Sequence, residues 1–123
     1  MAKKILIADD DELIRGLVKT SLKDEGYEFF EAEDGLQALK MAKDKVPDLL
    51  ILDIMMPGMI GYQVCKELKN DPKTNKIQII FLTSRSSSFS IGNTSQMGGG
   101  DGLITKPFNP LELSAWVKKI LGT

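Results

Sequence analysis

The segment PDLLILDIMMPGM, residues 47–59, indicates both the fold class and the position of the chemistry. Its apolar run, Leu49 to Leu52, is bounded by a proline and by a Pro-Gly pair, which is typical of a strand buried on both faces of a parallel sheet. The run ends abruptly at Asp53. An acid at the carboxyl end of such a strand opens into the crevice where α/β sheets bind ligands. Asp53 is therefore the first candidate functional residue, although an acid there can also simply cap a helix.

Strand-like and helix-like segments alternate along the rest of the chain. We expect further buried strands at residues 3–8 and 77–83, a strand nearer a sheet edge at 27–32 and a short strand at 102–105. Helices are expected at 12–25, 35–45, 61–70 and from 110 onward. This alternation predicts an α/β fold with a parallel sheet covered on both faces. The 123 residues suit one domain, residues 1–123, with no visible repeat or linker.

Helical spacing predicts which side chains turn toward the core. The expected inward residues are Leu13, Ile14, Leu17, Val18 and Leu22 in the first helix, Leu36, Leu39 and Ala42 in the second, Val64 and Leu68 in the third, and Leu113, Trp116, Val117 and Ile120 in the last. Gly26 is expected to end the first helix, and Asp34 and Asn109 to cap the second and the last.

One segment departs from the pattern. Ser84 to Gly102 should contain a helix between two strands, but it holds six serines and five glycines in nineteen positions. Glycine costs about 1 kcal/mol in a helix interior, and serine is a mediocre helix former. We predict that this fourth helix is short, frayed or absent, the alternative being that packing rescues about two turns.

Composition excludes several classes of function. The net charge of −1 gives no electrostatic reason to expect a nucleic acid or membrane partner. A single cysteine, Cys65, and the absence of a secretory signal pattern predict a cytoplasmic protein. The absence of histidine excludes Ser-His-Asp and Cys-His sites, and means that the chain cannot phosphorylate itself on histidine.

Polar residues close four of the predicted strands: Asp9-Asp10, Asp53, Thr83 and Lys106. Parallel strands place these ends at one edge of the sheet, so three carboxylates, a hydroxyl and an ammonium should meet there. Three like charges need a cation, and oxygen ligands in a wet site suit Mg²⁺. Taken singly, each residue also has a plain structural interpretation: a helix-capping acid, a strand-end hydroxyl or a surface lysine.

Such a site favours phosphoryl transfer. Asp53 is the carboxylate best placed to act as a nucleophile, and aspartyl phosphate is a known covalent form. Transfer of a phosphoryl group depends mainly on positioning and charge neutralisation, which a cation and Lys106 would supply. The Thr83 hydroxyl could donate a hydrogen bond to a phosphoryl oxygen.

Four motifs resemble the receiver domain of two-component response regulators. They are ILIADDDELIR (residues 5–15), PDLLILDIMMPGMIGYQVCKEL (47–68), IIFLTS (79–84) and ITKPFNPLEL (104–113). The second is a very specific match, and the likeness runs essentially the whole length of the chain.

The resemblance implies a flavodoxin-like fold, a doubly wound five-stranded parallel sheet with strand order 2-1-3-4-5. It makes Asp53 the phosphoacceptor, with Mg²⁺ held by Asp9, Asp10, Asp53 and the backbone carbonyl of Met55. It matches Thr83 to the family's switch residue, Lys106 to its lysine and Pro107 to a proline whose preceding bond is usually cis.

The partners that the resemblance implies are a sensor histidine kinase, a phosphotransfer protein or a small phosphodonor, with a downstream protein as target. The domain would not be an enzyme acting on other substrates, since it would catalyse only its own phosphorylation and dephosphorylation.

Three departures from the family pattern concern the output surface rather than the site. Ile60 stands where the family often has Asp, Leu103 stands where it has a switch aromatic, and Ser84–Gly102 lacks the usual amphipathic helix. They support an alternative, a receiver-like binding module whose switch is uncoupled from phosphorylation because Ser84–Gly102 is disordered.

Two further hypotheses have less support in the sequence. A phosphatase of the haloacid-dehalogenase type typically has Asp-x-Asp, whereas Met55 stands two residues after Asp53 and no cap domain is evident. A flavodoxin-like FMN carrier would hold a phosphate in its first loop, where Asp9, Asp10 and Asp11 would repel it.

Overall fold

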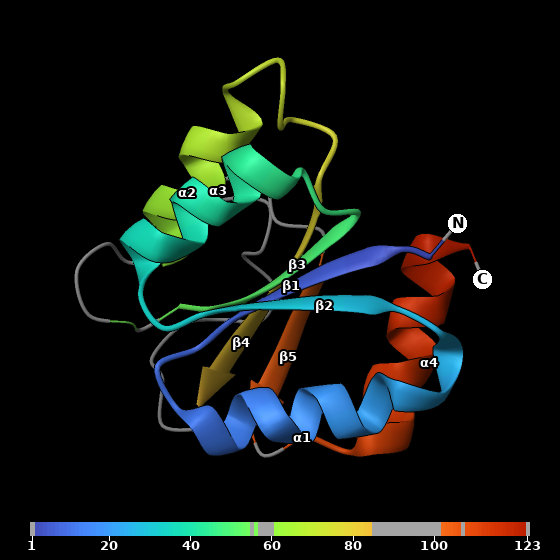
Figure 1. Cartoon of the computed structure of the whole chain (residues 1–123). Coiled ribbons are helices and arrows are strands. Elements are labelled where there is room, and N and C mark those ends of the chain that lie inside the picture. The colour runs from blue at the N-terminus through green and yellow to red at the C-terminus, as the bar shows by residue number, and fades with distance from the viewer. Residues whose placement is uncertain (1, 55, 57–60, 85–101, 107, 123) are drawn as a thin grey trace.

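Five parallel strands form one sheet in the order β2-β1-β3-β4-β5 (Figure 1). The computed structural model describes residues 2–54, 56, 61–84, 102–106 and 108–122. The strands are β1 Lys4–Ala8, β2 Glu28–Ala32, β3 Leu49–Asp53, β4 Gln78–Ser84 and β5 Gly102–Lys106. The predicted flavodoxin-like strand order is confirmed, and β2 lies at an edge as its sequence indicated.

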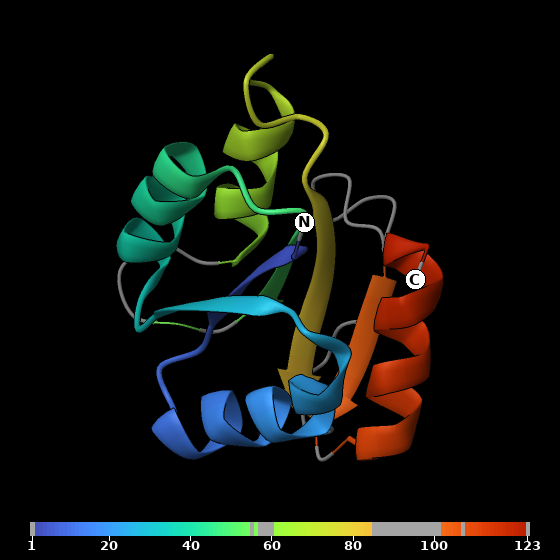
Figure 2. The ribbon, with the colours of Figure 1, turned by 45° about the vertical axis from the view of Figure 1, so that its right-hand side comes forward.

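Among the residues that the structure describes, helices cover both faces of the sheet (Figures 1 and 2). The helices are α1 Glu12–Leu22, α2 Gly35–Lys45, α3 Gly61–Lys69 and α4 Pro110–Leu121, and a short 3₁₀ turn, η1 Lys23–Glu25, follows α1. α1 contacts α4 on one face, and α2 contacts α3 on the other.

The central strand β3 is buried on both faces because its side chains alternate between two cores. Leu50 and Leu52 pack in the core under α2 and α3. Leu49 and Ile51 pack in the core under α1 and α4. The continuous apolar run of this strand therefore reflects a sheet that is covered by helices on both faces. Polar groups can gather at the carboxyl edge of the sheet, which the helices leave open.

The predicted caps Asp34 and Asn109 are confirmed, whereas Gly26 ends the 3₁₀ turn η1 and α1 itself already ends at Leu22. The side chain of Asp34 accepts a hydrogen bond from the Gln37 amide at 2.7 Å, and Asn109 accepts one from Leu111 at 2.9 Å. Gly26 has φ of 74°, a left-handed conformation that costs glycine little. These caps fix where α2, α4 and the turn after α1 begin or end.

The predicted apolar face of α1 is partly wrong. Leu13 and Leu17 are 78% and 53% exposed, whereas Arg15 is buried beside Val18. The apolar residues of α1 are distributed around a wider part of the helix surface than the sheet and α4 together can bury. The buried strip is therefore the one that contains Arg15, whose charge has partners on β2.

Two other inward assignments also need correction. Leu36 on α2 is 49% exposed, so it does not belong to the core. Trp116 on α4 is 41% exposed, although its indole lies against the backbone of β5 at Gly102, where a Cβ atom would stand 2.8 Å from Nε1. The ring covers a strand without being enclosed.

Some predictions fall outside the described residues. Ser84 ends β4 and Gly102 begins β5, but residues 85–101, which bear on the predicted fourth helix and on the predicted disorder, are not described. The carbonyl of Met55, the loop residue Ile60 and the bond before Pro107 also involve residues that are not described. Leu103, at the expected place of a switch aromatic, is half-buried against the core under α2 and α3. In the part of the chain that is described, every helix is too short or too polar to cross a bilayer.

Candidate functional site

The carboxyl edge of the sheet gathers the predicted site residues. Asp9 follows the last residue of β1, while Asp53 and Lys106 are the last residues of β3 and β5. The parallel register places Asp53 opposite Leu82, the neighbour of Thr83, and Lys106 opposite Ser84. The strand ends therefore bring residues that are far apart in sequence to one edge.

Three carboxylates converge there. Oxygens of Asp9, Asp10 and Asp53 all lie within 4.8 Å of one another. Asp9 is fully buried and Asp53 is 5% exposed, whereas Asp10 is exposed at the rim. Two such charges 4 Å apart repel by about 4 kcal/mol in the effective dielectric near a protein surface. This repulsion must be offset by positive charge.

Lys106 supplies part of that charge. Its Nζ lies 2.8 Å from Oδ2 of Asp9 and 3.2 Å from Oδ2 of Asp53. Burial alone would lower the pKa of Lys106, but the close contact and charge of Asp9, together with Asp53, outweigh it, and the pKa lies above its ordinary value. The ammonium therefore stays protonated at neutral pH and bridges β1 and β3 from β5.

The charge balance and donor set of this site fit a divalent cation. One ammonium against three carboxylates leaves two negative charges in excess. Oδ2 of Asp9 is buried and has an ion pair with Lys106 but no aligned hydrogen bond within the described chain. All the donors are oxygens, which favours Mg²⁺, Ca²⁺ or Mn²⁺ over zinc. Asp9, Asp10 and Asp53 could therefore hold such an ion.

Backbone hydrogen bonds hold Ile54, the residue that follows Asp53. The next amide, of Ile54, donates to the Leu82 carbonyl at 3.0 Å, and the Gly61 amide donates to the Ile54 carbonyl at 2.9 Å. A Cβ atom on Gly61 would lie 2.7 Å from the carbonyl oxygen of Asp53 and 2.9 Å from Cα of Ile54. Glycine at the start of α3 therefore permits the close approach that holds the strand end.

Thr83 lies at the same edge, in β4. It is 5% exposed and pairs with Thr105 of β5, one residue before Lys106. The predicted role of its hydroxyl, donation to a phosphoryl oxygen, stays a prediction. The predicted backbone ligand Met55 is not among the described residues.

Sequence reasoning missed Arg15. This residue of α1 donates from Nη1 to the backbone carbonyl of Asp9 at 2.6 Å, in a buried contact. Its spacing carried a signal, because Arg15 lies three residues before Val18 and seven before Leu22 on one helical strip. The predicted face of α1 was drawn from apolar residues alone, so Arg15 was not considered for it.

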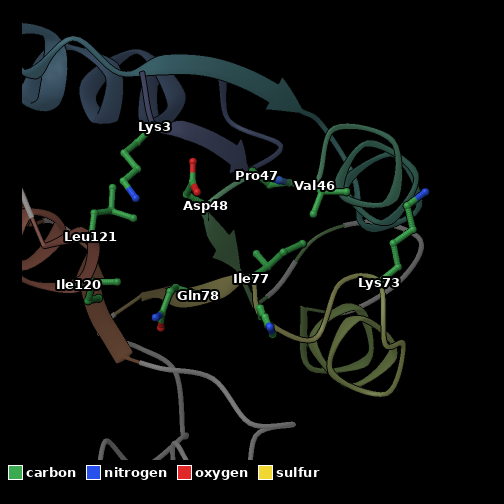
Figure 3. Close-up of a pocket in the computed structure, with 10 residues that line it drawn as sticks. Lys3, Val46, Pro47, Asp48, Lys73, Ile77, Gln78, Ile120 and Leu121 are labelled. Atoms are coloured by element: carbon green, nitrogen blue, oxygen red, sulfur yellow. The ribbon is translucent and has the colours of Figure 1, made fainter. Parts of the chain in front are cut away.

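The opposite edge of the sheet holds a different cavity, of about 270 Å³ (Figure 3). In Figure 3, Ile120 and Leu121 of α4 lie on one side of it, and Val46 and Pro47 on the other. Asp48 there accepts a hydrogen bond from the Lys4 amide at 2.8 Å, so its carboxylate ties β1 to β3. None of the predicted site residues lines this cavity.

Comparisons with known proteins agree with the geometry. The chain is 44% identical over 117 residues to the uncharacterised transcriptional regulatory protein YrkP of Bacillus subtilis, covering 95% of this chain and 48% of that protein. It is 40% identical over 121 residues to the alkaline phosphatase synthesis transcriptional regulatory protein PhoP of the same organism, covering 98% and 49%. The chain thus spans about half the length of these curated relatives.

A solved structure and a family model extend the comparison. The chemotaxis response regulator CheY4 of Vibrio cholerae has a TM-score of 0.85 and 32% identity, with 98% of this chain and 99% of that one covered. The family model described as the response regulator receiver domain matches residues 5–118. This chain therefore belongs to the receiver domains of two-component response regulators.

Proposed function

We propose that this chain accepts a phosphoryl group on Asp53 and thereby carries a signal in a two-component phosphorelay. The observation that carries the proposal is the ammonium of Lys106 held between Asp9 and Asp53, with Asp10 beside them at the edge of the sheet. This arrangement leaves a nucleophilic carboxylate and an excess of negative charge that a divalent cation would offset.

Asp9, Asp10 and Asp53 would hold Mg²⁺, together with the backbone carbonyl of Met55. When bound, Mg²⁺ supplies charge neutralisation for the oxygens of the transferred group. The chain's own residues have separate tasks. Burial of Asp9 keeps its carboxylate fixed, and the Gly61 contact fixes the backbone at Asp53.

In the proposed step, an oxygen of the Asp53 carboxylate attacks the phosphorus of a phosphohistidine. An O–P bond forms, the N–P bond breaks, and the imidazole nitrogen keeps the electron pair and takes a proton. Lys106 contacts the developing negative charge, and the Thr83 hydroxyl donates to a phosphoryl oxygen. In hydrolysis, water attacks the phosphorus, the bond between phosphorus and the Asp53 oxygen breaks, and inorganic phosphate leaves as the Asp53 carboxylate is restored.

The proposed donors are a sensor histidine kinase, a phosphotransfer protein or a small phosphodonor, because the chain has no histidine of its own. Residues 1–123 would act as one receiver domain. Two relatives are named as transcriptional regulatory proteins and are about twice as long as this chain. The expectation that no nucleic acid is involved therefore stays a prediction for these residues, as does a downstream protein target.

Intact-mass spectrometry tests this function. The chain is incubated with acetyl phosphate in Mg²⁺ or in EDTA, beside the variants Asp53→Asn and Asp44→Asn. Asp44 is a matched control because it is an exposed acid on α2. We expect one phosphoryl adduct in the wild type and in Asp44→Asn with Mg²⁺, and none in Asp53→Asn. An adduct of equal yield on Asp53→Asn would overturn the proposal.

A further inference from the structure

Arg15 is a buried cation whose three side-chain nitrogens all face oxygens. Nε donates to Oε1 of Glu31 at 2.9 Å, and Nη1 donates to the Asp9 carbonyl at 2.6 Å. Nη2 lies 3.8 Å from Oε1 of Glu33. The Arg15 side chain is 8% exposed. Burial of a guanidinium is costly unless its donors are paired, and the two short hydrogen bonds provide partners for Nε and Nη1.

The bond to the Asp9 carbonyl completes a set of contacts around that residue. The Asp9 amide donates to the Ala32 carbonyl at 3.1 Å, and Oδ1 accepts from the Asp11 amide at 2.9 Å. Oδ2 faces Lys106 at 2.8 Å. Ala32, Asp11 and Lys106 thus hold the amide and the carboxylate of Asp9, and Arg15 holds its carbonyl.

That carbonyl belongs to the peptide that joins Asp9 to Asp10. A peptide unit is planar, so a hydrogen bond to its oxygen fixes the direction of the whole plane. The direction of the plane determines where the chain leaves Asp9 and where Asp10 begins. Asp10 is exposed, and the structure gives its side chain no hydrogen bond to a described residue.

We propose that Arg15 is a positioning residue, which orients the Asp9–Asp10 peptide so that both carboxylates face Asp53 and a divalent cation. The inference rests on the proposed function, because it concerns the same acidic cluster. Arg15 acts through the backbone of Asp9 and does not touch the reacting atoms.

Three possible roles for Arg15 predict different changes in Mg²⁺ affinity when the residue is replaced. If its charge alone mattered, removing a cation near the acids would strengthen Mg²⁺ binding. If it only tied α1 to β2, the folded protein would bind Mg²⁺ as before. A positioning role predicts weaker Mg²⁺ binding, because the carboxylates of Asp9 and Asp10 would no longer be held in the orientation that lets both bind the cation.

Lys19 provides a matched control. It lies on the same helix and forms an ion pair with the same acid, Nζ to Oε2 of Glu31 at 2.7 Å, but the structure gives it no contact with Asp9. Lys19→Met removes one positive charge and one contact with Glu31, as Arg15→Met does. Arg15→Met in addition removes the bond to the Asp9 carbonyl and the longer contact with the exposed acid Glu33.

The test is isothermal titration of the full chain with Mg²⁺, for the wild type, Arg15→Met, Arg15→Lys and Lys19→Met. We expect Arg15→Met to bind Mg²⁺ about 10-fold more weakly than the wild type, the lower end for residues that support metal ligands. Arg15→Lys should fall between them, since an ammonium cannot hold Glu31 and the carbonyl as a guanidinium does. Lys19→Met should resemble the wild type.

A kinetic measurement adds a second readout. The Mg²⁺ concentration that gives half of the maximal rate of labelling by acetyl phosphate should be higher for Arg15→Met than for the wild type. The rate at saturating Mg²⁺ should approach that of the wild type. Equal or tighter Mg²⁺ binding by Arg15→Met than by Lys19→Met would overturn the inference. If Arg15→Met does not fold, the Mg²⁺ affinity of Arg15→Lys is compared with that of Lys19→Met, and equal or tighter binding by Arg15→Lys would overturn the inference.

The two proposals can fail separately. A wild-type chain that neither binds Mg²⁺ nor takes a phosphoryl group would overturn the proposed function and, with it, the role of Arg15. A wild-type chain that does both, with Arg15 variants that match it, would overturn only the role of Arg15.

Discussion

At the scale of single residues, Lys106 determines the charge of the site. Its ammonium faces both Asp9 and Asp53, and the resulting rise in its pKa keeps it charged at neutral pH. This ion pair opposes the repulsion between the acids, but it also competes with a cation for them. Lys106 should therefore affect metal binding and phosphoryl transfer in opposite directions.

Replacing Lys106 by Met tests this opposition. We expect tighter Mg²⁺ binding, because a competing positive charge is lost, and slower labelling by acetyl phosphate by about 10²–10³-fold, the loss typical of a group that stabilises developing charge. Calorimetry and intact mass measure the two effects. The control is Lys118→Met, which removes an ion pair with Glu25 and touches none of the three acids among the contacts of the described residues. Parallel changes in binding and rate would contradict this description.

Gly61 permits the close approach to Asp53. In Gly61→Ala the new Cβ would meet backbone atoms of Asp53 and Ile54 at 2.7 and 2.9 Å, so the backbone must shift. We expect urea unfolding to show a loss of about 1–3 kcal/mol. Gly16→Ala in α1 is the matched control, with open space around its Cβ and an expected gain of about 0.5–1 kcal/mol. A Gly61→Ala variant with the same free energy of unfolding as the wild type would contradict the close approach of Gly61 to the backbone of Asp53.

At the scale of elements, Glu31 joins α1 to β2 by accepting from both Lys19 and Arg15. The hydrogen bond from Lys19 lowers the pKa of Glu31 below its ordinary value of 4.5, burial opposes this, and Arg15 lowers it further. A lowered pKa in the folded state contributes stability that is present above 4.5 and is lost as pH falls through the folded value.

Comparison with Glu31→Gln isolates this contribution. Between about pH 7 and pH 3, the free energy of unfolding should fall more steeply for the wild type than for the variant, because only the wild type must protonate Glu31. Urea titrations at several pH values measure the difference between the two proteins. If the difference in unfolding free energy between the two proteins stays constant over this pH range, the charge of Glu31 does not stabilise the contact between α1 and β2.

The sequence predicted the strands better than the helix faces. A fully buried strand is a continuous apolar run, and Leu49 to Leu52 admits few other interpretations. The face of α1 was harder, because Leu13 and Leu17 satisfy helical spacing as well as Val18 and Leu22 do. Which strip is buried depends on contacts with β2 and α4, and these are not local in the sequence.

At the scale of the whole molecule, the candidate site follows from topology. Asp9, Asp53, Thr83 and Lys106 could be singled out because parallel strands all end at one edge. The strand order itself came from the resemblance to a family and is confirmed. Arg15 and its bond to the Asp9 carbonyl could not be derived, because they depend on how α1 is rotated against the sheet.

Binding of a cation by this edge should stabilise the entire fold. A ligand that binds only the folded state at ten times its dissociation constant adds about 1.4 kcal/mol to the free energy of unfolding. We expect thermal unfolding to show this gain for the wild type in Mg²⁺, and a smaller one for Asp9→Asn. A gain of equal size in Asp9→Asn would place the cation elsewhere.

The most direct test of the central claim is to locate the phosphoryl group. The chain is labelled with acetyl phosphate in Mg²⁺ or EDTA, and borohydride then reduces any aspartyl phosphate to homoserine before digestion and tandem mass spectrometry. We predict homoserine at position 53 alone, and only with Mg²⁺. Modification of another acid in place of Asp53, or an equal yield in EDTA, would contradict the assignment of this site.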